Sequence, residues 1–437
     1  MRIGTRSGRI GTARSHIIRT TLGSISDISH RVMIATYTPI HSVSYRMVSV
    51  FLTLGILAAV FVGFNIGGSS TGVAWGPSVG AKIINKTAAA ALMTFFVFLG
   101  GWTVGRNVIA TLGGDIVPQT IFTIEASIVV LFFIGLGMLV ANVYGVPVST
   151  SMTAVGAISG LGLATGQLDM AVLGGIVIWW MVSPIVGFWC GAVVGRYFYP
   201  YLDRKFAIQQ SEGPLLALDR TGALPKPALG PGTTPREAVS TVVVVLIACY
   251  MAFSAGASNV ANAVAPLVGG GLIGIEAGVT LGTVAIGLGA FTIARRTMDS
   301  VGNDLTALPL LAATIVMVIA SSITTFLSWL GIPMSLALST VMTIVGLGWG
   351  RATRQATATD LVRGDLDESV SVDAITAETA EEIPRVGEET PEDLQGVEQL
   401  FDGSAVIRFV SFWIIGPSLA TILSYIAFVL LPIAGTP

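Results

Sequence analysis

Long apolar segments recur along most of this 437-residue chain. A helix needs roughly 18 apolar residues to cross a bilayer, and ten segments approach or exceed that length. Only 11% of the residues are charged and the mean hydropathy is +0.80, so too few charges remain to coat a water-soluble protein. The sequence therefore predicts an all-α, multi-pass protein of the plasma membrane with about 10 to 12 membrane segments. The ten segments are 48–66, 88–104, 121–143, 148–164, 171–194, 239–255, 277–293, 308–330, 334–348 and 406–431.

Three polar segments interrupt this pattern. Residues 1–45 hold six arginines against one acid, Asp27, and read as a basic disordered tail or as sequence upstream of a start at Met33 or Met47. Residues 201–237 are rich in proline and read as a linker. Residues 351–403 carry 14 of the 25 acidic residues and read as a disordered loop, of a kind that suits a salt-rich (halophilic) environment.

An internal repeat is the most informative feature. The stretch GGSSTGVAWGPSVG (67–80) aligns with GASNVANAVAPLVG (256–269), and the counterparts lie 189 positions apart. Further on, GVPVSTSMTAVGAISGLG (145–162) aligns with GIPMSLALSTVMTIVGLG (331–348) at a separation of 186. Register held over such lengths indicates two homologous halves, 48–200 and 238–433, with the acidic loop inserted into the second.

The repeated stretches place serine and asparagine between small residues at membrane depth, as in SAGASNVANAVAPLVGG (254–270). Each half has an odd number of spans, so we expect two inverted-topology repeats with discontinuous or re-entrant helices, the pattern of secondary transporters. Unwound backbone in a membrane must line a cavity or pack against protein. Hydroxyl and amide groups and helix N-termini there would bind an anion. The alternative is that the small residues only permit close helix packing.

GASNVANAVAP resembles the signature of the inorganic phosphate transporter (PiT) family, which reads roughly G-S-N-D-V-A-N-A-I-G-P. GVPVSTSMTAVGA and FTIARRTMDSVG are similar to two further motifs of that family, so the resemblance covers nearly all of 48–433. It implies a phosphate carrier coupled to sodium or protons that works by alternating access, or a sulfate or other oxyanion permease of the same family. It also implies a homodimer. The substrate-binding residues that we predict are Gly68, Ser69, Ser70, Thr71, Ser149, Thr150, Ser151, Ser258, Asn259, Asn262 and Ser335.

The chain departs from the family pattern at its acidic positions. The signature Asp falls at Ser70 in the first half and at Asn259 in the second, and the later Asn is kept as Asn262 but becomes Val73. A hard cation prefers several oxygen ligands that include formal negative charge, so the sodium coupling of the family is placed in doubt. Anion binding by N–H and O–H donors needs no carboxylate and is the firmer part of the resemblance.

Few ionisable residues lie within the apolar segments. Glu125 is a candidate proton carrier, although a residue at the mouth of its helix is the alternative. Asp115 is expected to cap a loop or to pair with Arg106. All three histidines precede the first apolar segment, which excludes a histidine metal or proton site in the membrane. Both cysteines lie in apolar segments, which argues against a disulfide framework and favours core packing.

Other classes of function fit less well. The chain has no HExxH motif, no nucleophile elbow and no pair of intramembrane Asp residues, so we do not expect an enzyme. A transport-deficient receptor or regulator is an alternative that the lost Asp pair motivates. We expect the lipid bilayer and inorganic phosphate or sulfate as partners, no nucleic acid and no cofactor. The arginines of the tail favour a cytosolic N-terminus, whereas the resemblance implies an external one, and the orientation stays open.

Overall fold

The structure is a computed structural model that describes residues 49–143, 149–206, 216–219, 226–229, 234–295, 298, 310–352, 403–431 and 433. The chain divides into two units, residues 1–54 and a main unit of residues 55–437. The predicted basic tail (1–45) and nearly all of the acidic loop (351–403) lie outside the described residues.

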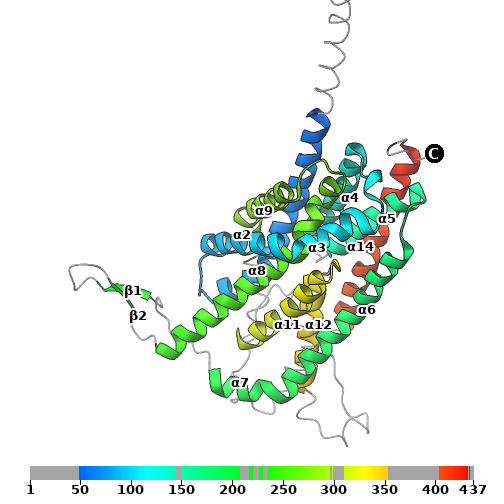
Figure 1. The fold of residues 1–437 in the computed structure, drawn as a ribbon. Coiled ribbons are helices and arrows are strands. Elements are labelled where there is room, and N and C mark those ends of the chain that lie inside the picture. The colour runs from blue at the N-terminus through cyan, green and yellow to red at the C-terminus, as the bar shows by residue number, and fades with distance from the viewer. Residues whose placement is uncertain are drawn as a thin grey trace, which may run out of the picture. The chain divides into compact units, whose positions relative to one another are not determined.

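Helices make up almost the whole described chain (Figure 1). The first runs from Ser49 to Gly80 and belongs to the main unit from Gly55 onward. The other α-helices are α2 (Lys86–Thr103), α3 (Gly105–Ala110), α4 (Ile124–Val143), α5 (Thr150–Thr165), α6 (Met170–Val193), α7 (Tyr199–Phe206), α8 (Pro235–Gly269), α9 (Ile275–Phe291), α11 (Leu310–Trp329), α12 (Leu336–Ala352) and α14 (Gly403–Leu430).

Short elements complete the described chain. Two π-helical turns, η1 (Thr111–Asp115) and η3 (Val194–Phe198), continue α3 and α6, and η2 (Gln119–Ile121) is a 3₁₀ turn. An antiparallel hairpin of β1 (Leu216–Asp219) and β2 (Lys226–Leu229) lies in the segment that the sequence predicts as a linker.

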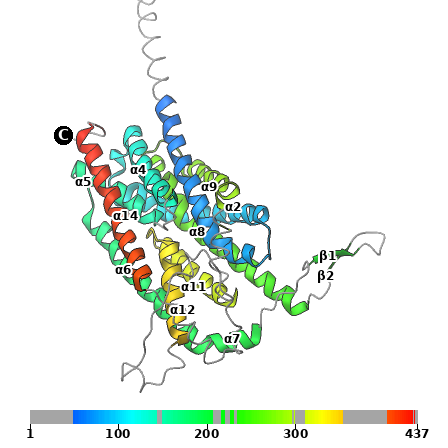
Figure 2. The same ribbon diagram turned by 180° about the vertical axis from the view of Figure 1, so that it is seen from behind.

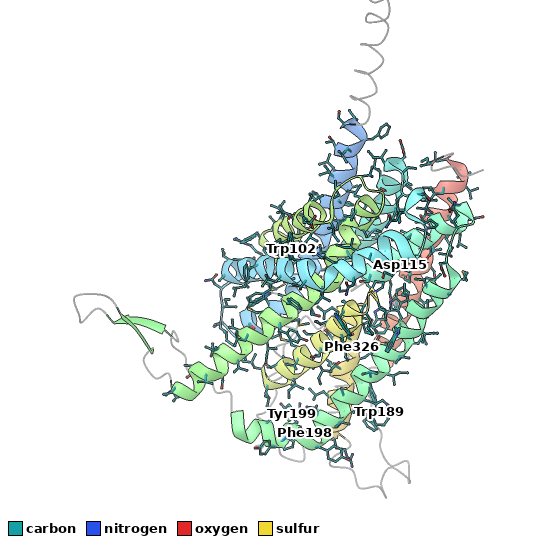
Figure 3. All side chains as sticks on the ribbon, in the orientation of Figure 1. Trp102, Asp115, Trp189, Phe198, Tyr199 and Phe326 are labelled. Carbon is teal, nitrogen blue, oxygen red and sulfur yellow. The ribbon has the colours of Figure 1, made fainter. Side chains whose placement is uncertain are left out.

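Six described helices are long and apolar enough to cross a membrane, and three shorter ones are apolar. The six are Ser49–Gly80, Lys86–Thr103, Met170–Leu202, Glu237–Gly269, Leu310–Trp329 and Trp413–Leu430. Bulky apolar side chains cover their outer faces, among them Trp189 and Phe198, which point outward from α6 and its continuation (Figure 3) and are 58% and 54% exposed. The prediction of an all-α, multi-pass membrane protein is confirmed.

The helix breaks do not lie where we expected them. The first helix and α8 continue without interruption through 67–80 and 254–269, so the prediction of unwound backbone there is wrong. Hydroxyl groups in these stretches bond back within the helix, as Thr71 Oγ1 does to the Gly67 carbonyl at 2.6 Å. The discontinuity lies in the second repeated motif, where α5 and α12 begin immediately after Ser149 and Ser335. Gly331, with φ of 79°, turns the chain after α11.

Glycines bring the two halves together in matched pairs. Gly67 packs so closely on the Ile286 backbone that a methyl group would collide with its carbonyl, and Gly256 packs in the same way on Val97. Gly256 and Val97 are the repeat counterparts of Gly67 and Ile286, each 189 positions away. These contacts between the two repeated stretches and their partners are therefore reciprocal.

The last helices of the halves are exchanged. α5 of the first half packs along α14 of the second, and α12 of the second half packs along α6 of the first, as both ribbon views show (Figures 1 and 2). Gly160 lies against the Thr421 carbonyl in one pair, and its counterpart Gly346 lies against the Phe188 carbonyl in the other. The small residues that the sequence repeats therefore set the distances between helices.

Candidate functional site

Buried polar side chains from α5 and α8 meet beside the chain that enters α12. Ser151 Oγ lies 3.3 Å from Ser258 Oγ, and both hydroxyls donate to the main-chain carbonyl of Met334, Ser151 at 3.0 Å. Asn262 Nδ2 donates to Ser151 Oγ at 3.1 Å and to Asn259 Oδ1 at 3.2 Å. Since α8 is helical here, Asn262 lies beside both Asn259 and Ser258, which precede it by three and four residues.

The first half reaches this group through Ser70. Asn259 Nδ2 donates to Ser70 Oγ at 3.4 Å, and the two residues are repeat counterparts, 189 positions apart. This contact joins equivalent positions of the two repeated stretches. We call Ser70, Ser151, Ser258, Asn259, Asn262 and the Met334 carbonyl the central cluster.

The central cluster is uncharged, and all of its side chains except Ser70 are buried. Ser151, Ser258 and Asn262 are 0% exposed and Asn259 is 6% exposed. Among the described residues, Asn262 Oδ1 has no hydrogen-bond partner. Because a buried polar atom without a partner costs about 1–3 kcal/mol, this oxygen points to an additional donor in the functional protein. The cluster thus offers hydroxyl and amide donors and one free acceptor.

Two helix N-termini begin at the central cluster. Ser149 caps α5 by accepting from the Met152 N–H at 3.3 Å, and Ser335 caps α12 by accepting from the Leu338 N–H at 3.2 Å. Within the described chain, the N–H groups of Thr150 and Leu336, the first residues of these helices, have no acceptor. Helix N-termini carry partial positive charge, so both favour an anion at this place.

The other predicted site residues lie apart from these contacts. Ser69 Oγ donates back to the carbonyls of Asn65 and Ile66 at 3.3 and 3.2 Å, and Thr71 is occupied within its helix. Gly68 faces the side chain of Ile293. Thr150 is buried, and its hydroxyl forms no hydrogen bond with the described chain.

Glu125 is not part of the central cluster. It lies in the first turn of α4, where a negative charge is favourable, and no hydrogen bond joins it to the described cluster residues. Its neighbour Ser127 donates to the Pro266 carbonyl at 3.0 Å, one helical turn beyond Asn262. Glu125 therefore lies on α4 two residues before a contact with the C-terminal part of α8.

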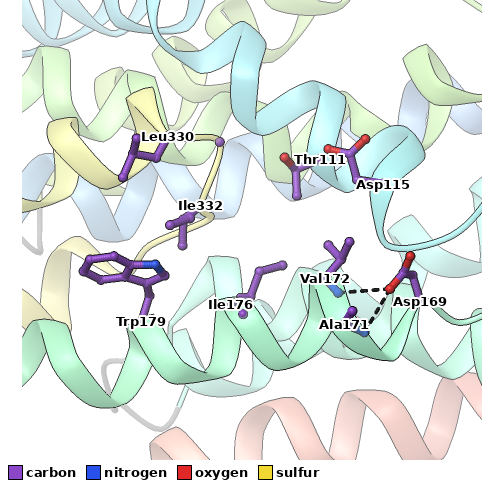
Figure 4. Close-up of a pocket in the computed structure, with 11 residues that line it drawn as sticks. Thr111, Asp115, Asp169, Ala171, Val172, Ile176, Trp179, Leu330 and Ile332 are labelled. Carbon is purple, nitrogen blue, oxygen red and sulfur yellow. Dashed lines mark hydrogen bonds between the residues drawn. The ribbon is translucent and has the colours of Figure 1, made fainter.

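A pocket with two carboxylates lies elsewhere in the described chain. Its volume is 480 Å³, and it lies between η1, the start of α6 and the chain at 330–332 (Figure 4). Asp115 and Asp169 line it, and Asp169 Oδ1 caps α6 by accepting from the N–H groups of Ala171 and Val172. Carboxylates repel an anion, so this pocket is a poor place for an oxyanion.

Arg106 does not pair with Asp115, which corrects one of our two expectations for that acid. Its guanidinium lies 3.5 Å from a carboxylate oxygen of Glu276 and 4.7 Å above the ring of Trp102. Trp102 and Asp115 are both marked in Figure 3. The pairing with Glu276 joins α3 to the start of α9 of the other half.

The sequence did not point to Met334 or to the polar face of α11. The contact of Met334 is made by its main-chain carbonyl, which every residue has, so the residue type gives no sign of it. Met334 does immediately precede the predicted Ser335. Ser254 Oγ donates to the Ser321 carbonyl at 3.1 Å, and a spacing of four residues along α8 relates Ser254 to Ser258 and Ser258 to Asn262. That spacing was available in the sequence.

Comparison with known proteins identifies relatives of the whole fold. A model described as "Phosphate transporter family" matches residues 66–371. The chain is 28% identical to "Sulfate permease CysP" of Bacillus subtilis, over 68% of this chain and 77% of that protein. It is 26% identical to a "Putative phosphate permease" of Pyrococcus furiosus, over 69% and 88%. A solved structure described as "The sodium-dependent phosphate transporter" shares the fold, with a TM-score of 0.59 and 19% identity over 87% of this chain and 100% of that chain.

Proposed function

Because the chain belongs to the phosphate transporter family, we propose that it is a secondary active transporter that carries inorganic phosphate across the plasma membrane, coupled to protons or sodium. The family consists of transporters and not of enzymes, and the candidate membrane spans make the chain a multi-pass membrane protein. One observation carries the proposal. Ser70 and Asn259, at equivalent positions of the two repeated stretches, are in contact at the edge of an uncharged and otherwise buried cluster of hydrogen-bond donors.

The donors of the central cluster suit an oxyanion. Ser151, Ser258 and the amide groups of Asn259 and Asn262 supply O–H and N–H groups, and the N-termini of α5 and α12 add positive dipole ends. Since no carboxylate belongs to the described cluster, no formal negative charge there repels an anion. Binding would exchange the hydrogen bonds among these side chains for bonds to the substrate oxygens.

The reciprocal contacts between the two halves support an alternating-access mechanism. In transporters built from inverted repeats, the substrate binds at the interface of the repeats near the middle of the bilayer, and one repeat moves against the other. Contact across the halves at Ser70 and Asn259 fits that position. We propose that the two halves of this chain are inverted with respect to the membrane.

Sulfate is a second candidate substrate. The Bacillus subtilis relative is named a sulfate permease. A carboxylate in the site would accept a hydrogen bond from the P–OH group of phosphate and would disfavour sulfate, which carries no such proton. The described cluster contains no carboxylate, so sulfate is not disfavoured in this way. The unpartnered Asn262 Oδ1 favours phosphate, because it is an acceptor for a P–OH group. A site that pairs a substrate hydroxyl discriminates against an analogue that lacks it.

Uptake into proteoliposomes tests this function. Purified protein is reconstituted, and uptake of labelled phosphate and of labelled sulfate is measured under a sodium gradient alone and under a pH gradient alone. We expect phosphate uptake above that of protein-free liposomes, competed weakly by sulfate. Sulfate uptake without phosphate uptake would establish the second candidate. No flux of either anion under any gradient would contradict transport and favour a receptor.

A further inference from the structure

A row of polar side chains runs along α8 from the central cluster toward the start of the helix. Asn262, Ser258, Ser254 and Tyr250 follow one another at intervals of four residues, or about 6 Å. The two members farthest from the central cluster, Ser254 and Tyr250, face α11. Ser254 Oγ donates to the Ser321 carbonyl at 3.1 Å, and Tyr250 Oη donates to Ser322 Oγ at 3.4 Å. The row therefore follows the contact between α8 and α11.

Across this contact, α11 holds hydroxyl groups that lack partners. Ser321, Thr324 and Ser328 are each 0% exposed, and their hydroxyl oxygens form no hydrogen bond within the described chain. Spacings of three and four residues place them on one face, which continues the face of Met317 and Ala320 in the main core. We call the α8 row and these three residues the hydroxyl seam.

Helical self-bonding does not explain the missing partners. Elsewhere on α11, Thr314 and Ser322 donate to the carbonyls four residues earlier, each at 2.7 Å. Ser321, Thr324 and Ser328 do not, although the same acceptor geometry is available in any helix. Burying unpaired hydroxyls is unfavourable, so these positions suit a polar partner such as water or an anion.

The first half shows that the fold does not need hydroxyls at these positions. At the separation of 186 residues, the counterparts of Ser321 and Thr324 are Gly135 and Met138, and at 189 the counterpart of Tyr250 is Phe61. The Phe61 ring packs over Gly135, where a Cβ would lie 2.5 Å from it, and Met138 is 1% exposed. At these three positions the first half is apolar and the second half is polar, whereas Ser254 and Ser328 have the polar counterparts Asn65 and Asn142.

We propose that the hydroxyl seam is the hydrated passage by which the oxyanion travels between the central cluster and the Tyr250 end of α8. This inference rests on the proposed function of the central cluster. Neutral hydroxyls donate to an oxyanion at successive helical turns without the fixed charge that would hold it, as passage through a pore requires. The first-half counterpart, with Phe61 over Gly135, is the barrier to the opposite side.

Thiol labelling tests the passage independently of uptake. Both native cysteines, Cys190 and Cys249, are first replaced by serine, and single cysteines are then introduced at Thr324, at Ser328 and, as the matched first-half control, at Met138. A charged, membrane-impermeant methanethiosulfonate is applied to proteoliposomes, and modification is measured by mass. We expect Thr324→Cys and Ser328→Cys to react, with protection by inorganic phosphate, and Met138→Cys to stay unmodified.

The outcomes separate this inference from the proposed function. If uptake persists while neither seam cysteine reacts from inside or outside the vesicles, the passage lies elsewhere and the inference is wrong. If the parent protein takes up no anion, the proposed function fails, whatever the labelling shows. Should a cysteine variant not fold, Thr324→Val and Thr324→Ser replace it. We expect the isosteric valine to lower phosphate uptake about tenfold and serine to retain it, and equal uptake by both would overturn the inference.

Discussion

The two halves of the molecule agree in their backbone contacts and differ in their polar side chains. Gly67 on Ile286 and Gly256 on Val97 repeat one contact, and Gly160 and Gly346 repeat another. The hydroxyl seam repeats only in part, because Phe61 and Gly135 stand where the second half has Tyr250 and Ser321, whereas Asn65 stands at the counterpart of Ser254. The shared contacts are those that hold helices at a given distance, and the differing positions are those that water or a substrate would meet. The packing contacts are thus repeated in both halves, whereas the proposed passage is repeated only in part.

The strongest test of the shared packing is a bulky residue at a matched glycine. Gly256→Val and Gly67→Val should each abolish recovery of folded protein, because the added side chain collides with backbone that cannot move aside. Monodisperse protein after detergent extraction is the measurement. Gly174→Val, where nothing lies within 4 Å, is the control and should be recovered normally. A well-folded Gly67→Val beside a lost Gly256→Val would break the equivalence of the halves.

A carboxylate introduced at the contact between Ser70 and Asn259 should strongly lower phosphate uptake. Asn259→Asp or Ser70→Asp puts a negative charge into the central cluster, where repulsion of about 4 kcal/mol per charge at 4 Å opposes an anion. We expect phosphate uptake without sodium to fall at least about 100-fold. Ser70→Ala, which removes one hydrogen bond, should lower it only several-fold. If sodium restores phosphate uptake by Asn259→Asp, a bound cation compensates the charge of the new carboxylate. If uptake without sodium is unchanged, the central cluster is not the substrate site.

The helix caps allow a matched pair of smaller changes. Ser149→Ala and Ser335→Ala each remove an accepting hydroxyl from the start of a helix, at a cost of about 1 kcal/mol in stability. Thermal unfolding in detergent should show similar losses for both variants, and serine-to-threonine variants should retain most of the stability. A loss in only one of the two would show that the helix starts are not equivalent.

The smallest effect is expected at Glu125. Since its carboxylate has no hydrogen bond to the described cluster residues, Glu125→Gln should change uptake less than about twofold and should keep uptake driven by a pH gradient. Uptake under separate pH and sodium gradients is the measurement. Loss of pH-driven uptake with intact phosphate exchange would make Glu125 the proton carrier and would give the first half a role that the second lacks.

Much of the fold followed from patterns within the sequence. The apolar segments 148–164 and 334–348 correspond closely to α5 and α12, because length and hydropathy are properties of the segment itself. The ends of the first helix and α8 were missed by more than a turn, since serine, glycine and asparagine were taken as breaks. In a packed membrane protein, hydroxyls that bond back within the helix and glycines that admit a neighbouring backbone leave such a helix intact.

The sequence by itself determined the class of protein, the duplication and the residue types at the site, because composition, repeat and motif are written in the order of residues. Only the tertiary structure decided that Ser70 meets Asn259, that the Met334 carbonyl joins them and that Ser321, Thr324 and Ser328 are left without partners in the described chain. Contacts between residues nearly two hundred positions apart depend on how helices cross. A main-chain carbonyl or an unpaired hydroxyl becomes distinctive only when its surroundings are known.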